Sequence, residues 1–353
     1  MTTIADSPTL KERGTAMRRL IAIATVTGMT VPGLVAAAGP TRAVVPGTNG
    51  RIVFSRETCT HTCMYSIVAA NPNDTDENVL AGPYPRDAYD DHFIANWAPA
   101  GTSVIFMLYN EIWQVRPDGT GLHELLDPPE GTGVDDGPTF TPDGARIVFT
   151  LCCPEGFGYS LWMINAEGTG LRDVTKEPVF NGDGPADDAP QVSPDGKHIV
   201  FSRCFPDQPN CVIATVNISG NHLRQLTDST QFNAQRPNWS PDSKKIVFEV
   251  VTADGTPDIA TMNADGSGLT QLTFNTPGET FSHSPCYSPD GTKILFQQRP
   301  STAGGVDLFT MNLDGSGTTQ VTRTPTNERE PEWAVGPGRV GDLEHSKPEG
   351  GSS

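Results

Sequence analysis

The chain contains an internal repeat with a position that is aromatic in most copies. The residues four places before this aromatic position differ in chemical type from copy to copy. The residues at this position are Phe93, Asp136, Asp188, Gln235, His283 and Arg329. Asp91 and His92 lie beside the first of them, and Asp135 and Asp187 lie beside two others. Repeats arranged around an axis would bring these side chains into a ring at one mouth of a central channel. Several carboxylates and an imidazole that converge there predict a binding site for a cation or a basic peptide segment.

Two other interpretations of these residues stay open. Aspartates at such positions also cap turns and tie neighbouring repeats together. A glycosidase would need a pair of carboxylates, for which Asp136 and Asp188 are the natural nominees. The chain has no Gly-x-Ser-x-Gly nucleophile elbow, and the residues after Trp333 are too few for an α/β catalytic domain. The sequence therefore assigns no catalytic residue, and it favours a binding role over an enzyme that acts on a saccharide or peptide.

The cysteines predict disulfides and no metal site. His-x-x-x-His and Cys-x-x-Cys spacings are both absent, so no motif marks a metal site and we expect no cofactor, although His92 and His283 could converge in the ring. Cys204 and Cys211 flank a short link between two expected strands, and Cys59 and Cys63 occupy the matching link of the first repeat. We expect both pairs to form disulfides, with Cys204–Cys211 as the first candidate and Cys59–Cys63 as the second. We expect Cys286 to be a buried thiol.

The charge of the chain excludes one class of partner. It has 24 basic and 42 acidic residues, a formal net charge of -18. This surplus repels phosphate backbones, so nucleic acid is not an expected partner. Its simplest consequence is solubility. We expect a monomer that binds a protein, peptide or glycan ligand.

A repeated apolar run identifies the elements that must position these residues. Each run ends in a phenylalanine, and the six copies are Phe54, Phe106, Phe149, Phe201, Phe248 and Phe296. Successive copies are 52, 43, 52, 47 and 48 residues apart, which is the spacing of propeller blades. A tight turn such as Ser193-Pro194-Asp195-Gly196 precedes every run except the first, and a second turn such as Asp265-Gly266-Ser267-Gly268 follows most runs. These turns predict antiparallel strands.

The fifth repeat carries a specific resemblance. It contains Trp239-Ser240-Pro241-Asp242, then Ile246-Val247-Phe248, then Met262-Asn263-Ala264-Asp265-Gly266-Ser267-Gly268. This order resembles the WD40-like (PD40) repeat of TolB-type propellers, over about residues 49–336. The resemblance implies an all-β fold, a six-bladed β-propeller of four-stranded antiparallel blades, that serves as a binding or scaffolding module. TolB has a small α/β domain before its propeller, which this sequence leaves no room for, so its role with its envelope partner is not carried over.

The first repeat lacks the turn and the aromatic strand that open the others. Pro331-Glu332-Trp333-Ala334 supplies such a strand at the far end, and we expect it to pair into the first blade. Pairing closes the ring and removes two exposed strand edges. The first and third links of every blade are uniform turns, whereas the second and fourth links vary. The face that carries the second and fourth links, called the variable face below, is the expected docking surface.

The N-terminal region predicts export. Met17, Arg18 and Arg19 precede an apolar run that ends in Ala36, Ala37 and Ala38, as in a secretion signal. We therefore expect an extracytoplasmic protein, secreted or periplasmic, with no stable membrane insertion after cleavage. The expected organisation is an extension and signal at 1–38, a linker at 39–48, the propeller at 49–336 and a disordered polar tail at 337–353.

Overall fold

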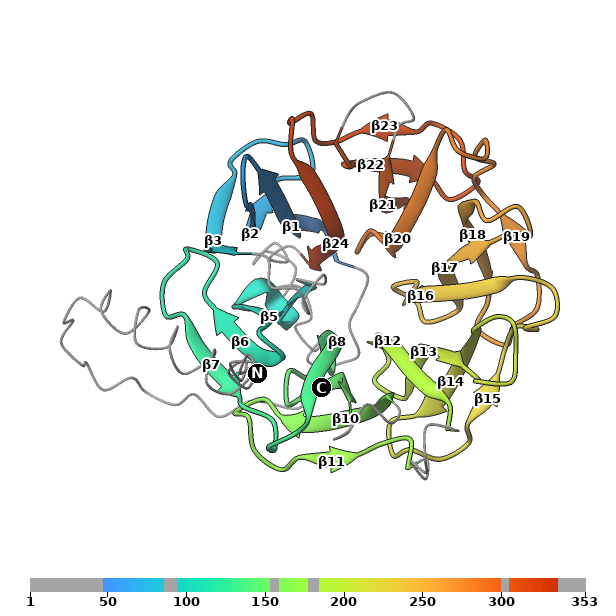
Figure 1. The fold of residues 1–353 in the computed structure, drawn as a ribbon, viewed down its shortest axis with the longest axis horizontal. Coiled ribbons are helices and arrows are strands. Elements are labelled where there is room, and N and C mark those ends of the chain that lie inside the picture. The colour runs from blue at the N-terminus through green and yellow to red at the C-terminus, as the bar shows by residue number, and fades with distance from the viewer. Residues whose placement is uncertain (1–46, 86–93, 153–158, 177–183, 300–304, 336–353) are drawn as a thin grey trace, which may run out of the picture. The chain divides into compact units, whose positions relative to one another are not determined.

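The computed structural model describes residues 47–85, 94–152, 159–176, 184–299 and 305–335. These residues belong to the unit Arg42–Ser353 and form six four-stranded sheets. The sheets follow one another around a ring (Figure 1), so the six-bladed β-propeller expected from the repeats is confirmed. None of these residues forms a helix long and apolar enough to cross a membrane.

Within each blade, four strands follow one another from the channel outward. Blade 1 consists of β24 (Asn327–Val335), β1 (Asn49–Cys59), β2 (Cys63–Ala70) and β3 (Asn78–Pro85). Blade 2 consists of β4 (Ala95–Trp97), β5 (Val104–Leu108), β6 (Glu111–Val115) and β7 (His123–Leu126), with the 3-10 turn η2 (Pro99–Gly101) after β4. Blade 3 consists of β8 (Gly133–Phe140), β9 (Arg146–Cys152), β10 (Tyr159–Asn165) and β11 (Arg172–Asp173).

The remaining blades repeat this arrangement. Blade 4 consists of β12 (Ala186–Val192), β13 (His198–Cys204), β14 (Val212–Asn217) and β15 (Arg224–Gln225). Blade 5 consists of β16 (Asn233–Trp239), β17 (Lys245–Val251), β18 (Pro257–Asn263) and β19 (Thr270–Gln271). Blade 6 consists of β20 (Phe281–Tyr287), β21 (Lys293–Arg299), β22 (Asp307–Asn312) and β23 (Thr319–Gln320).

The core lies between neighbouring blades. The repeated phenylalanines, from Phe54 in β1 to Phe296 in β21, are all fully buried. Each packs in a cluster that joins two adjacent sheets; Phe54, for example, lies with Leu295 and Leu308 of blade 6. Apolar burial of this kind stabilises each blade only when its neighbours are present, so the ring is one folding unit.

Five inner strands share a bulge that aims side chains at the channel. A residue with positive φ interrupts the ladder and is followed each time by proline; these residues are Gly137, Ala189, Arg236, Ser284 and Glu330. Proline has no N–H to donate, so it is tolerated on this channel-facing edge. A bulge bends the strand and re-aims its side chains. In blade 2, Ala95 stands in place of the proline and the positive φ is absent.

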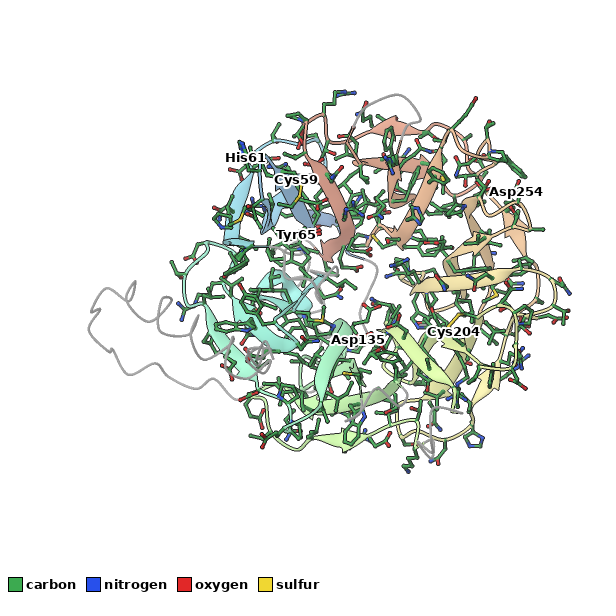
Figure 2. All side chains as sticks on the ribbon, in the orientation of Figure 1. Cys59, His61, Tyr65, Asp135, Cys204 and Asp254 are labelled. Carbon is green, nitrogen blue, oxygen red and sulfur yellow. A yellow bond between two sulfur atoms is a disulfide. The ribbon has the colours of Figure 1, made fainter. Side chains whose placement is uncertain are left out.

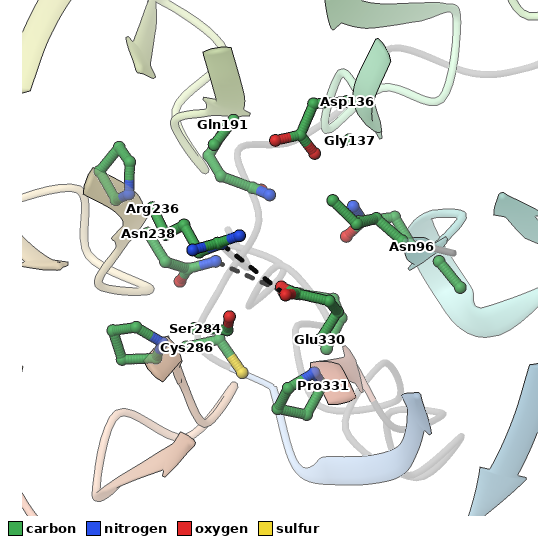
Figure 3. Close-up of a pocket in the computed structure, with 16 residues that line it drawn as sticks. Asn96, Asp136, Gly137, Gln191, Arg236, Asn238, Ser284, Cys286, Glu330 and Pro331 are labelled. Atoms are coloured by element: carbon green, nitrogen blue, oxygen red, sulfur yellow. Dashed lines mark hydrogen bonds and ion pairs between the residues drawn. The ribbon is translucent and has the colours of Figure 1, made fainter. Parts of the chain in front are cut away.

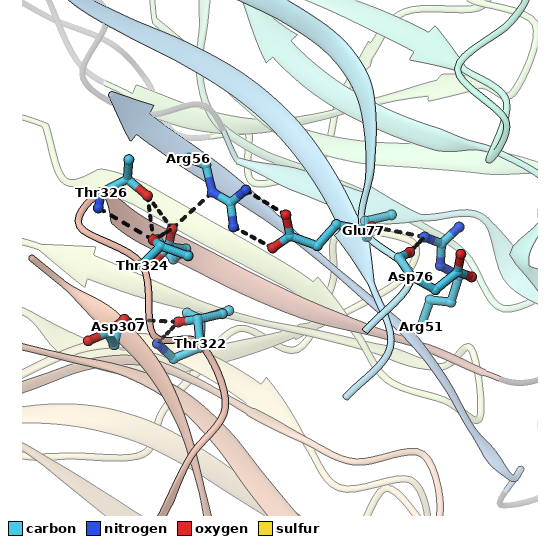
Figure 4. Close-up of polar contacts among 11 residues, drawn as sticks. Arg51, Arg56, Asp76, Glu77, Asp307, Thr322, Thr324 and Thr326 are labelled. Atoms are coloured by element: carbon cyan, nitrogen blue, oxygen red, sulfur yellow. Dashed lines mark hydrogen bonds and ion pairs between the residues drawn. The ribbon is translucent and has the colours of Figure 1, made fainter. Parts of the chain in front are cut away.

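The C-terminal strand closes the ring, as expected. β24 pairs antiparallel with β1, and Trp333 lies opposite Ile52. Trp333 is buried, and its indole N–H donates to the carbonyl of Gly50 at 3.1 Å. Arg56 of β1 strengthens the same seam, since it donates to Glu328 of β24 at 2.9 Å and to Glu77 at 2.6 Å (Figure 4).

Both expected disulfides are present on the variable face. Cys59 bonds to Cys63 and Cys204 bonds to Cys211 (Figure 2), each across the second link of its blade. Cys286 is buried and forms no disulfide, as expected. Ala186 at the start of β12 pairs with Cys204 at the end of β13. The inner strands therefore begin on the variable face.

The other regional expectations lie outside the described residues. These are the signal and extension at 1–38, all but the last two residues of the linker at 39–48, and the tail at 337–353. Asp91, His92 and Phe93 of the expected ring are outside them as well.

Candidate functional site

A small cavity lies in the central channel. Its walls come from all six inner strands, and the residues at the bulges and two positions beyond them provide most of the polar groups (Figure 3). Polar side chains that line it include Asn96, Asp136, Gln191, Arg236, Asn238 and Glu330. The water-accessible volume is about 60 Å³. At roughly 15 Å³ for each water-sized group, this is room for about four such groups.

The expected ring divides into an acidic pair and three residues with other partners. Asp136 lines the cavity and its carboxyl group contacts that of Asp188 in the next blade. Gln235 donates to the disulfide sulfur of Cys211 at 3.6 Å. The remaining two, His283 and Arg329, bind glutamates described below.

Asp136 is buried, and it holds negative charge poorly. Asp136 is 5% exposed. Burial first, and then the charge of Asp188 and a hydrogen bond with it, raise the pKa of Asp136 well above its usual range. Burial and the charge of Asp188 also raise the pKa of neighbouring Asp135 to about 6. Asp136 therefore tends to keep its proton, because it is buried beside a second carboxyl group.

A chain of charged groups crosses the other side of the channel. His283 Nδ1 lies 3.1 Å from Glu249 Oε2, and Arg236 Nη1 lies 3.6 Å from the same oxygen. Arg236 Nε lies 3.7 Å from Glu330 Oε1, which joins blade 5 to blade 1 (Figure 3). Burial acts to raise the pKa of Glu249, but the bond from His283 and the charge of Arg236 outweigh it and lower that pKa. Arg236 is therefore already shared by two carboxylates.

Arg329 belongs to the rim near blade 1. Its guanidinium lies 3.4 Å from Glu57 Oε2, and Asn327 donates to the same oxygen at 2.8 Å. Glu57, Cys59 and Cys63 are grouped closely enough to hold a metal ion. Both sulfurs are bonded to each other, however, so they offer no thiolate ligand.

Asp187 does not add charge to the channel mouth, contrary to the expectation. It is fully buried, and it accepts two hydrogen bonds from Arg203 at 2.6 and 2.8 Å. Successive residues of a strand point to opposite sides, so Asp188 and Asp187 face different surroundings. Asp187 is a structural residue.

The comparisons with known proteins agree with this architecture. The sequence pattern of the TolB beta propeller domain (PD40) matches residues 88–273, just over half of the chain. The chain belongs to the TolB β-propeller family. An uncharacterised protein of Agrobacterium fabrum is 26% identical over 202 residues, which cover 57% of this chain and 64% of the relative. The Tol-Pal system protein TolB of Francisella tularensis is 28% identical over 166 residues, 46% of this chain and 35% of that protein.

This TolB-family propeller thus spans less than two thirds of the length of these relatives. The crystal structure of TolB from Acinetobacter baumannii superposes with a TM-score of 0.65 at 19% identity, covering 81% of this chain and 66% of the other. An oligogalacturonate lyase from Vibrio parahaemolyticus gives a TM-score of 0.52 at 12% identity, covering 77% and 79%. At these identities the likeness is one of fold alone.

Several residues that line the cavity of this TolB-family propeller were not predicted from the sequence. Arg236 and Glu330 follow the predicted ring position by one residue, and Glu332 follows it by three. The available signal was the proline after the bulge, as in Arg236-Pro237 and Glu330-Pro331. A dipeptide of this kind at the same place in five repeats indicates a bulge and a channel-facing side chain.

Glu332 should make the stability of the TolB-family propeller depend on pH. Burial raises its pKa to about 8, from an ordinary 4.5, and its carboxyl accepts from Asn238 at 3.5 Å. Between these pH values the unfolded chain loses a proton that the folded protein keeps, so the free energy of unfolding falls as pH rises from about 4.5 to 8. The loss is on the order of 3–5 kcal/mol at pH 8.

Urea unfolding of wild type and Glu332→Gln at pH 5 and pH 8 measures this contribution. The variant keeps a neutral polar group, so we expect it to lose less stability over this interval than wild type. The same pH dependence in both proteins would show that Glu332 is not the titrating group. The comparison cancels the contributions of Asp135 and Asp136, because both proteins contain them.

Proposed function

We propose that this protein is an extracytoplasmic binding module whose protein partner docks on the variable face and places a positively charged segment at the channel mouth. The observation that carries the proposal is the acidic group of Asp135, Asp136 and Asp188, which Arg236 compensates only from a distance. Among the described residues, no lysine or arginine forms an ion pair with these three. The nearby guanidinium of Arg236 is engaged by Glu249 and Glu330. A cationic segment would supply the missing charge.

Three further observations support this function. The family match and the relatives named as proteins of the Tol-Pal system fit a module that assembles with other proteins. The apolar run before Ala38 and the two disulfides fit export to an oxidising compartment. The cavity, at about 60 Å³, is small and lined by charged and amide side chains, which suits a polar side chain of a protein partner.

The acid pair does not suit glycoside hydrolysis. Glycosidases hold their two carboxyl groups about 5–5.5 Å or about 6.5–9.5 Å apart, so that a sugar or a water fits between them. The carboxyl groups of Asp136 and Asp188 are in direct hydrogen-bonding contact. The binding function is therefore better supported than the enzymatic alternative.

Binding of a fluorescent oligolysine peptide, followed by anisotropy, tests the proposed function. We expect saturable binding that weakens as salt rises, since exposed charges are screened beyond about 10 Å at 0.1 M. The Asp136→Asn, Asp188→Asn double variant should bind about tenfold more weakly, with an unchanged or slightly higher melting temperature because the substitutions relieve carboxyl repulsion.

The matched control is Asp207→Asn with Glu279→Gln. Both residues are exposed, lie in links of the variable face and stand outside the cavity lining. This control makes the same kind of substitution at two carboxylates away from the channel, so its affinity should stay near that of wild type. Equal losses in the two double variants would reduce the effect to net charge and contradict a site at the channel mouth.

A further inference from the structure

The second link of blade 1 brings two cysteines together with a buried carboxylate. Cys59 and Cys63 lie directly opposite each other where β1 ends and β2 begins, and Glu57 lies opposite Tyr65 in the same ladder. Side chains alternate along a strand, so these four residues share one face of the hairpin. The two sulfur atoms and a carboxylate oxygen of Glu57 lie within 4.8 Å of one another. No other group of three such ligands is found in the part of the chain that the structure describes.

The carboxylate of Glu57 is held in place by its neighbours. The hydroxyl of Tyr65 donates to Glu57 Oε1 at 2.9 Å, and the side-chain amide of Asn327 in β24 donates to Glu57 Oε2 at 2.8 Å. Glu57 is only 4% exposed, so its carboxylate has little freedom to turn away. Hydrogen bonds of this kind orient the ligands of metal sites and contribute to their affinity. Three adjacent strands, β24, β1 and β2, thus fix one oxygen ligand beside the two sulfur atoms.

The donor atoms and their charges select zinc. Thiolate sulfur is a soft ligand that suits Zn²⁺, whereas Ca²⁺ and Mg²⁺ take oxygen ligands. Two thiolates and one carboxylate around Zn²⁺ leave a single negative charge. The guanidinium of Arg329 lies 3.4 Å from Glu57 Oε2 and offsets that charge. Zinc in a structural site takes four ligands in a tetrahedral arrangement, so one position remains to be filled.

His61 is suited to the fourth position. It is the middle residue of the loop 60–62, two residues from each cysteine, and it is exposed (Figure 2). The imidazole nitrogen is a common zinc ligand. An exposed loop residue can turn toward a metal ion at the end of the hairpin without leaving a packed position. The order Cys59-Thr60-His61-Thr62-Cys63 therefore places three zinc-binding residue types in five consecutive positions.

We propose that this link becomes a Zn²⁺ site when its disulfide is reduced, with Cys59, Cys63, Glu57 and His61 as ligands. A dithiol reductant acts by two successive exchanges: the bond between the two sulfurs breaks, two S–H groups form, and the reductant becomes a disulfide. Cys59 is exposed, so the reductant can reach the bond. Zn²⁺ then replaces the two thiol protons, which pass to solvent. The site goes beyond the proposed function and does not depend on it.

Titration of the reduced full chain with Co²⁺ and then Zn²⁺ tests this site. A phosphine serves as the reductant, because a free dithiol would itself chelate the metal. We expect Co²⁺ to give the near-ultraviolet absorption of a cobalt–thiolate bond and Zn²⁺ to displace it, and we expect neither change in the oxidised chain. Cys59→Ser with Cys63→Ser should abolish the absorption. The matched control, Cys204→Ser with Cys211→Ser, should retain it, because that pair has no third ligand close by among the described residues.

Glu57→Gln and His61→Ala test the other two ligands. Each should weaken Zn²⁺ binding at least about tenfold, measured by competition with a chromophoric chelator. Melting curves of the oxidised variants establish that they fold. Unchanged cobalt absorption in the Cys59→Ser, Cys63→Ser variant would assign the metal to other cysteines and overturn the inference. Undiminished affinity in both Glu57→Gln and His61→Ala would reduce the site to chelation by two thiols and overturn it as well, as would equal binding by the oxidised chain.

Discussion

Removal of residues 331–353 is expected to abolish cooperative unfolding of the propeller. The deletion takes away Trp333, which is buried opposite Ile52, and it leaves the channel-facing edge of β1 unpaired along that part of the strand. Loss of a buried tryptophan alone costs about 3–5 kcal/mol. This is a large part of the roughly 5–15 kcal/mol that stabilises a domain. Thermal melts followed by near-ultraviolet circular dichroism would measure the loss.

A shorter deletion and a point variant make the test specific. Removal of residues 339–353 should leave the melting curve unchanged, whereas Trp333→Ala should lower the free energy of unfolding by about 3–5 kcal/mol. A protein ending at Glu330 that melted cooperatively at the wild-type temperature would show that closure by β24 is not needed for stability.

Asp187→Ala is expected to destabilise the protein by about 3–5 kcal/mol, because it leaves a buried arginine without its charge partner. Arg203 is nearly as buried as Asp187, and its guanidinium donates both bonds to that carboxylate. Chemical unfolding in urea gives the change in free energy. The double variant Asp187→Ala, Arg203→Met should recover part of it, since no buried charge then remains.

Asp188→Asn is the matched comparison, because it lies one residue away and removes the same charge. It should change the free energy of unfolding little and affect ligand binding instead. If Asp187→Ala and Asp188→Asn destabilised the protein equally, the division into a structural and a binding aspartate would be wrong.

The fold could be predicted from the sequence because its determinants repeat. The apolar runs that end in Phe54 or Phe296, and the turns before them, keep their spacing around the chain. The position of Trp333 followed from a strand missing in the first repeat. The two disulfides could also be anticipated, because each pair of cysteines flanks a single link.

The candidate site was only partly predictable because it depends on the inner-strand bulges. A bulge shifts which residues of a strand face the channel, so strict alternation does not say whether Asp187 or Asp188 points inward. The approach of Arg236 to Glu330 joins strands of blades that are not neighbours in the ring. No local pattern encodes such a pair, which depends on the width of the closed channel.

The proline-backed bulges allow the side chains that line the channel to vary between related proteins. Each bulge residue reaches the same small space from a separate copy of the repeat, and its backbone is shaped by the proline that follows it. The side chains there range from none at Gly137 to the long cation of Arg236 and the anion of Glu330. A substitution at one of these positions can alter the ligand without disturbing the apolar contacts between blades. The inner strands therefore present five bulge positions whose side chains can change, singly or as the pair Arg236 and Glu330, while the apolar scaffold between the blades stays constant.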